Sequence, residues 1–217
     1  AYGGILYEGR IVDGKRIFIT KKDMEEVIRI SRISPYEILT KESDTEVGHI
    51  YGLAVSGFVG STLEIETMVY PAKEKGKGVA RFNDTAGSMA KDSVFNAASV
   101  IRKITGLDMS DYDVHVNVIG GAKIDGPSAG AAITLCIISA LENRPIRQDM
   151  AVTGEISIRG KVKPVGGIFE KVYGARRKGI RHVLIPYDNR KDIPGNMEDI
   201  EVTPVKDIEE LMSLILV

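Results

Sequence analysis

Residues 123–142 read KIDGPSAGAAITLCIISALE, and this stretch decides how the rest of the chain is arranged. Its apolar part, residues 129–141, contains no charged residue, so it predicts a helix that is buried on all sides. Gly126 and Pro127 favour the start of that helix. Ser128 is therefore expected in the first helical turn, where unpaired backbone N–H groups favour negative charge.

Ser128 has two interpretations. Serine is a common helix N-cap, and small residues in front of a core helix are ordinary packing. The same position also suits a nucleophile, because the backbone N–H groups of Gly126, Ser128 and Ala129 would stabilise a developing oxyanion. The choice between the two depends on whether the chain supplies a base.

The composition sets limits on fold and function. A chain of 217 residues with 43% hydrophobic content can bury a large core, as one main domain with an appendage. The net charge of -1 provides no electrostatic footprint for nucleic acid or an anionic membrane. No segment is apolar for long enough to span a bilayer, and no secretory signal is visible. Cys136 excludes an internal disulfide, so we expect an inert thiol and a cytoplasmic protein.

The first 45 residues differ from the rest. Residues 9–19 predict a hairpin around an Asp-Gly turn, and a helix with a capping box from Thr20 to Asp23 follows. Residues 34–46 are polar and predict a linker. We therefore expect a hairpin–helix segment at 1–45 and the main domain at 46–217. Because the chain opens without a methionine, we expect it to be a piece of a longer polypeptide.

Period-two and period-3.6 patterns predict the elements of the main domain. Strands are expected at 47–55, 62–70, 79–82, 113–119, 150–153, 156–158, 162–165, 182–186 and 200–205, and further helices at 84–105, 167–178 and 208–216. Strand 79–82 is expected to return beside strand 62–70 across the KEKGKG loop, which lacks the spacing of a nucleotide-binding loop. Strands that alternate with helices predict an α/β sandwich.

Two types of base could serve Ser128. GPSAG matches the G-x-S-x-G elbow of α/β-hydrolase esterases, which need a histidine after the serine, and His182 alone lies downstream. His49 and His115 precede the serine. The alternative is Lys171, near the start of a helix and beside its apolar stripe. As a base it needs a pKa lowered from roughly 10.4 to about 7 to 8, and burial acts in that direction.

The motifs DGPSAG at 125–130 and MAVTGEISIRGKVKPVGGIFEKV at 150–172, followed by VLIP, resemble the proteolytic domain of Lon proteases. The resemblance covers roughly residues 47–216. It implies an α/β fold of the ribosomal protein S5 domain 2-like kind, with Ser128 as nucleophile and Lys171 as base. Thr153, in the TGE segment, is expected beside the lysine and accepts its hydrogen bond.

The resemblance also implies an ATP-dependent serine endopeptidase that degrades unfolded or damaged polypeptides as a homo-hexamer. ATP and Mg are expected on an upstream AAA+ module, with residues 1–45 as its tail, and no cofactor or metal is expected in this domain. If the parent protein is of the archaeal type, its membrane tether lies outside this chain. The rival hypothesis is a catalytically silent Lon-like domain that serves assembly or partner binding.

Asp125 is the ambiguous residue of the first motif. A carboxylate in contact with Lys171 would raise the pKa of the lysine and hold the site in a latent state, or it would orient the Ser128–Lys171 pair. We predict that Asp125→Asn raises peptidase activity near pH 7 and moves the pH profile toward lower pH. An unchanged rate and profile would remove Asp125 from the mechanism.

Overall fold

The computed structural model describes residues 20, 22–23, 44–56, 59–83, 88–119, 126–195 and 199–217. The chain divides into two compact units, 1–38 and 39–217. In the first unit the predicted capping box is confirmed, because the N–H of Thr20 donates to Asp23 at 2.8 Å and the N–H of Asp23 donates to Thr20 at 3.3 Å. The predicted hairpin at 9–19 lies outside the described residues.

The described strands of the second unit follow the predicted alternation closely. They are β1 (Thr45–Glu46), β2 (His49–Ser56), β3 (Val59–Pro71), β4 (Ala80–Phe82), β5 (Tyr112–Ile119), β6 (Ile146–Arg147), β7 (Met150–Val152), β8 (Glu155–Ile156), β9 (Val162–Lys163), β10 (His182–Pro186) and β11 (Glu201–Val205). The helices are α3 (Ser88–Thr105), α4 (Gly130–Glu142), α5 (Ile168–Arg177) and α6 (Ile208–Ile215), with 3₁₀ turns η1 (Met109–Asp111), η2 (Pro127–Ala129) and η3 (Tyr187–Asp192).

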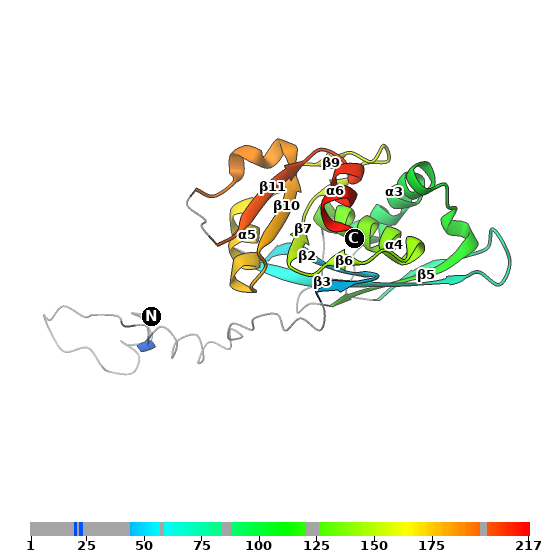
Figure 1. Ribbon diagram of the computed structural model, residues 1–217, viewed down its shortest axis with the longest axis horizontal. Helices are drawn as coiled ribbons and strands as arrows, with labels where there is room; N and C mark the ends of the chain where they lie inside the picture. Colours follow the sequence, from blue (N-terminus) through cyan, green and yellow to red (C-terminus); the bar gives the residue numbers. More distant parts are fainter. Residues whose placement is uncertain are drawn as a thin grey trace, which may run out of the picture. The chain divides into compact units, whose positions relative to one another are not determined.

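Seven of these strands form one mixed sheet in the order β11-β10-β7-β2-β3-β5-β4 (Figure 1). The strands β11, β10, β7 and β2 are parallel to one another, whereas β3 is antiparallel to both β2 and β5. Two short antiparallel pairs, β1–β6 and β8–β9, lie outside this sheet. The predicted α/β class is therefore confirmed.

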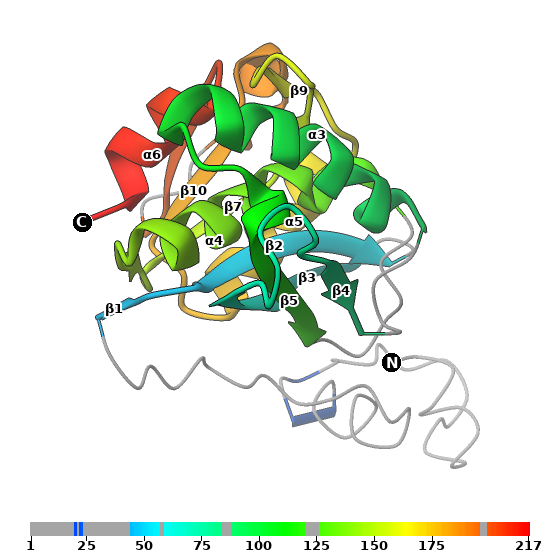
Figure 2. The ribbon, with the colours of Figure 1, turned by 90° about the vertical axis from the view of Figure 1, so that its right-hand side faces the viewer.

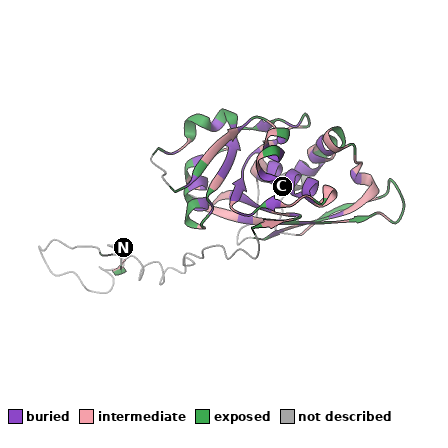
Figure 3. Ribbon diagram, viewed as in Figure 1, coloured by how far each residue is buried: buried purple, intermediate pink, exposed green. Residues whose placement is uncertain are grey.

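The sheet carries hydrophobic side chains on both faces, and helices cover each. On one face α3, α4 and α6 pack over Ile50 and Ile65 in the larger core (Figures 1 and 2). On the other face α5 packs over Tyr51 and Leu53 in a second core. The buried residues accordingly lie at the sheet and at the sides of the helices that face it (Figure 3).

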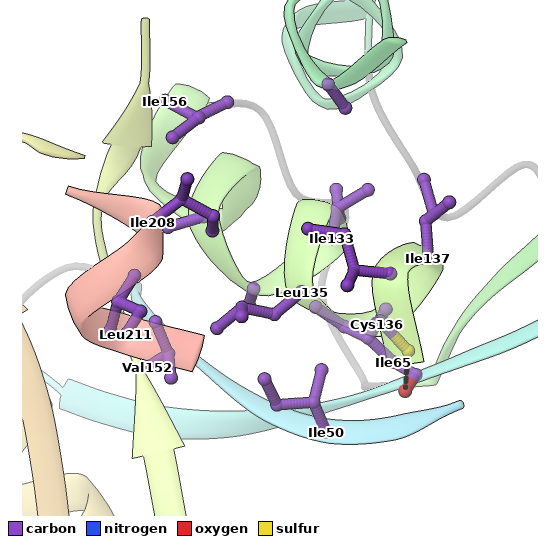
Figure 4. Close-up of a cluster of buried hydrophobic side chains, with 14 of the residues drawn as sticks. Ile50, Ile65, Ile133, Leu135, Cys136, Ile137, Val152, Ile156, Ile208 and Leu211 are labelled. Atoms are coloured by element: carbon purple, nitrogen blue, oxygen red, sulfur yellow. Dashed lines mark hydrogen bonds between the residues drawn. The ribbon is translucent and has the colours of Figure 1, made fainter. Parts of the chain in front are cut away.

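Helix α4 is the centre of the larger core, as its uncharged sequence predicts. Residues 130–139 are all buried, and Ile133, Leu135 and Ile137 contact the sheet and the neighbouring helices (Figure 4). The Cys136 thiol donates to the carbonyl of Ile65 at 3.3 Å. Because burial raises the pKa of this thiol to about 12, the interpretation of Cys136 as an inert core residue agrees with its surroundings.

The predicted pairing of strand 79–82 is wrong. Strand β4 pairs in parallel with β5, at the edge of the sheet, and does not return beside β3. The reason is that β5 occupies one edge of β3 along residues 64–71, next to the loop, while β2 occupies the other edge along residues 59–66. The KEKGKG loop therefore crosses the end of β5, where the N–H of Gly78 donates to the carbonyl of Ser110.

Two glycines allow α5 to lie directly against β3. A Cβ atom at Gly60 would overlap the carbonyl group of Glu170, and a Cβ atom at Gly174 would overlap the backbone of Gly60. Gly174 stands in the interior of a helix, where glycine costs about 1 kcal/mol relative to alanine. This backbone-to-backbone contact explains why a helix-disfavouring residue occurs there.

We predict that Gly60→Ala destabilises the protein by about 3 kcal/mol, because the added methyl group meets backbone atoms that cannot move aside. Gly195→Ala is the matched control, since no described atom lies within 4 Å of a Cβ there. Chemical denaturation of both variants would measure the difference. Equal stabilities would contradict the proposed contact between α5 and β3.

Candidate active site

Ser128 lies in the middle of η2, the 3₁₀ turn that leads into α4. The preceding Gly126 is extended, with φ -149° and ψ 159°, and Pro127 begins the turn, where its missing N–H leaves no donor unsatisfied. Ser128 itself is half-buried. The sequence predicted it in the first turn of the buried helix, and the structure places it in the tighter turn immediately in front of α4.

The backbone of Ser128 is tied to the end of β7. Its carbonyl accepts hydrogen bonds from the N–H of Gly154 at 2.9 Å and from the hydroxyl of Thr153 at 3.3 Å. The carbonyl of Gly154 in turn accepts from the N–H of Ala131 at 3.0 Å. These bonds hold the serine turn against residues 153–154, which directly follow β7. Gly154 was not among the predicted site residues, although it stands in the TGE segment.

Gly130 brings the start of α4 close to two other elements. A Cβ atom at this position would lie 3.0 Å from the hydroxyl of Ser93 on α3 and 3.2 Å from the backbone nitrogen of Ile156 on β8. The missing side chain at Gly130 therefore permits close approach of α3 and of the β8 main chain.

Lys171 lies in the second turn of α5 and is 3% exposed. It is buried more deeply than the predicted place at the border of the apolar stripe, because the contact between Gly60 and Gly174 draws α5 onto the sheet. Burial lowers the pKa of Lys171 from its ordinary value of 10.5 to about 8. The direction and size match the change that a general base at this position requires.

Ser128 and Lys171 line the same cavity, although 43 positions separate them in the chain. The cavity has a volume of about 380 Å³, and its other lining residues are apolar or small: Val55, Pro127, Pro164, Val165 and Gly166. Ser128 and the buried Lys171 therefore border one space that is large enough for part of a peptide.

Thr153 is fully buried and contacts the serine rather than the lysine among the described residues. Its hydroxyl donates to the carbonyl of Ser128, whereas the resemblance implied that it accepts a hydrogen bond from Lys171. The two arrangements are compatible, since a hydroxyl that donates one hydrogen bond keeps its acceptor lone pairs.

Asp125 lies outside the described residues, so its contact with Lys171 stays a prediction. The oxyanion role of the N–H groups of Gly126, Ser128 and Ala129 likewise stays a prediction. Gly126 precedes the serine turn, and Ala129 is its last residue.

The three histidines lie away from the cavity. His182, at the start of β10, is within 2.8 Å of the Thr203 hydroxyl. His49, at the start of β2, contacts Gln148, and His115 on β5 contacts Arg81 on β4. Because none of the three lines the cavity with Ser128, the geometry does not favour a histidine base.

Across the described ranges, no group of three or more His, Cys, Asp or Glu side chains is arranged to hold a metal ion. No helix in the same ranges is both long enough and apolar enough to cross a membrane.

The family model of the Lon protease (S16) C-terminal proteolytic domain matches residues 18–217. The chain belongs to the Lon protease family. The match begins within the 1–45 segment, and the expected domain boundary near residue 46 stays a prediction.

Several curated Lon proteases resemble the chain. Lon protease 2 of Bacillus subtilis (strain 168) is 40% identical over 96% of this chain, and the archaeal Lon protease of Pyrococcus abyssi is 36% identical over 94%. The Lon protease of Escherichia coli (strain K12) is 37% identical over 93% of this chain. The aligned region makes up 40%, 22% and 26% of these three relatives respectively, so the chain spans less than half of each.

We predict that Lys171→Met stabilises the folded chain at pH 7 by about 3 kcal/mol, because folding transfers a protonated amine out of water. Below about pH 8 both folded and unfolded states hold the proton and the full penalty applies. Between about pH 8 and 10.5 the folded state releases its proton first, so the advantage of the variant shrinks as pH rises.

Denaturation of wild type and variant at pH 7 and pH 10 would measure this difference. Lys103→Met, at an exposed position of α3, controls for the substitution itself. A gain at position 171 that is no larger than at position 103 would contradict the burial of a charged amine.

Proposed function

We propose that this chain is the proteolytic part of an ATP-dependent serine endopeptidase, with Ser128 as nucleophile and Lys171 as general base. The observation that carries the proposal is the single cavity lined by both side chains, in which burial lowers the pKa of Lys171 to about 8. Lysine is a recurrent base for serine nucleophiles. Membership of the Lon family supports a peptide bond as the bond that is cleaved.

The proposed reaction begins when the neutral Nζ of Lys171 takes the proton of the Ser128 hydroxyl as Oγ attacks the peptide carbonyl. The tetrahedral intermediate collapses to an ester on Ser128, and Lys171 returns the proton to the departing amine. Water then attacks the ester with Lys171 again as base, which releases the acid and regenerates the serine. Atoms and protons balance over the two steps.

Backbone N–H groups of Gly126, Ser128 and Ala129 are the proposed donors to the oxyanion. The start of a helix suits this role, because its first N–H groups have no acceptor within the helix. Thr153 supports the site through the serine, since its hydroxyl and the N–H of Gly154 both hold the Ser128 carbonyl. A rigid serine turn would keep Oγ aligned with the amine.

The larger assembly is proposed from the relatives. All three described above are named Lon proteases and are more than twice as long as this chain. We propose that an AAA+ module binds ATP and Mg, unfolds polypeptides and delivers them to the Ser128 cavity in a homo-hexamer in the cytoplasm.

We predict that a fluorophosphonate reacts with Ser128 and that the rate rises with pH to a plateau above about pH 8. At pH 7 about one tenth of Lys171 is neutral, so the rate should be about tenfold below the plateau. Labelling of the protein at a series of pH values, with mass spectrometry of the modified peptide, would measure both quantities.

Three variants separate this proposal from its rivals. Ser128→Ala should lose the label, and Lys171→Met should lower the labelling rate by about 10²–10⁴-fold. His182→Ala should leave the rate within about twofold, whereas an esterase with a histidine base would lose it. A wild-type protein that takes no label at any pH would contradict the proposal in favour of a silent domain.

A further inference from the structure

Asn189, in η3, is a buried amide whose polar atoms are used by two neighbours. It is 6% exposed. Its Oδ1 accepts the N–H of Val165 at 2.9 Å, while its Nδ2 donates to the carbonyl of Val165 at 3.0 Å and to the carboxylate of Asp192 at 2.8 Å. Because Val165 presents both a donor and an acceptor, the amide fits in one orientation only.

The side chain of Asn189 makes the two backbone hydrogen bonds to Val165 that a neighbouring strand would otherwise make. The N–H and the C=O of one residue point to the same side in extended backbone, and a neighbouring strand normally binds both. At Val165 the side chain of Asn189 does so instead. Strand β9 has ended at Lys163, and Pro164 has no N–H to contribute to a ladder.

Val165 belongs to one side of the Ser128–Lys171 cavity. The cavity is lined on this side by Pro164, Val165 and Gly166. We call these three residues the 164–166 wall. Asn189 itself is absent from the lining residues. Its amide therefore acts on the site through the backbone that it holds.

The lysine is held by other contacts. Helix α5 buries Ile168 and Val172 in the second core, and its backbone meets β3 at Gly60 and Gly174. The N–H of Lys171 also donates to the carbonyl of Gly167 within the helix at 2.9 Å. Loss of the Asn189 contacts should therefore move the 164–166 wall and leave Lys171 in place.

We propose that Asn189 is a positioning residue that holds the 164–166 wall in the conformation that receives the polypeptide substrate. This inference rests on the proposed function of the cavity. The wall and Ser128 line the same space, which a substrate would occupy. Displacement of the wall therefore weakens peptide binding without altering the proton transfer between Lys171 and Ser128.

The test compares peptide hydrolysis with fluorophosphonate labelling in the full chain. Asn189→Asp keeps the shape and the acceptor for the Val165 N–H, but it loses both donors and directs a carboxylate at the Val165 carbonyl and at Asp192. We expect the KM of a peptide substrate to rise about tenfold, while the labelling rate of Ser128 and its pH profile stay within twofold of wild type.

A double variant distinguishes positioning from general stability. Asn189→Asp combined with Asp192→Asn places an amide beside the new carboxylate, which removes the repulsion between the two and should restore much of the thermal stability. The Val165 carbonyl still lacks its donor, so the KM should stay high. Asp192→Asn alone leaves both Asn189–Val165 bonds in place and should keep the KM within twofold of wild type.

A normal KM in Asn189→Asp, or a KM that recovers together with stability in the double variant, would overturn the inference. A labelling rate that falls in parallel with peptide hydrolysis would also overturn it, since the dyad would then depend on Asn189. Failure of the proposed function would be distinguishable from failure of this inference, because the wild-type protein itself would then not react with the fluorophosphonate.

Discussion

The burial of the Lys171 amine is the constraint on which the rest of the site depends. A protonated amine is strongly hydrated, and its removal from water opposes folding at neutral pH. The protein opposes this penalty with the packing of α5, whose neighbouring residues Ile168 and Val172 are buried in the second core. The lowered pKa of Lys171 and the cost of burying it on folding thus have the same physical origin.

Glycine contacts, rather than ion pairs, set the geometry around the cavity. Gly60 and Gly174 allow α5 to approach β3, Gly130 allows α4 to approach β8, and Gly154 holds the carbonyl of Ser128. Backbone contacts of this kind tolerate very little displacement, because no side chain can rotate out of the way. Ser128 and Lys171 therefore come from elements whose backbones are fixed by close contacts with their neighbours.

Local patterns predicted most of the elements. The uncharged run of α4, the alternating valines of β5 and the Gly166–Gly167 start of α5 each depend on residues close together in the chain. The pairing of β4 could not be found in this way. Its partner depends on which edges of β3 are already occupied, and β5, which occupies one of them, begins about thirty residues after β4.

The candidate site shows the same division. Periodicity placed Lys171 beside an apolar stripe, and physical chemistry gave the direction of its pKa change. The resemblance to Lon proteases identified the serine and the lysine as a pair. The depth of Lys171, the Thr153 contact with Ser128 and the Asn189 contact with Val165 join distant parts of the chain and leave no periodic pattern.

The single cysteine of the chain sits in α4, the helix that follows Ser128, where it has no exposed surface and burial raises the pKa of its thiol to about 12. Alkylating reagents react with the thiolate, so modification at neutral pH must await an excursion that brings Cys136 into solvent. The rate at which Cys136 is alkylated would therefore report how often α4 opens and exposes its buried side to solvent.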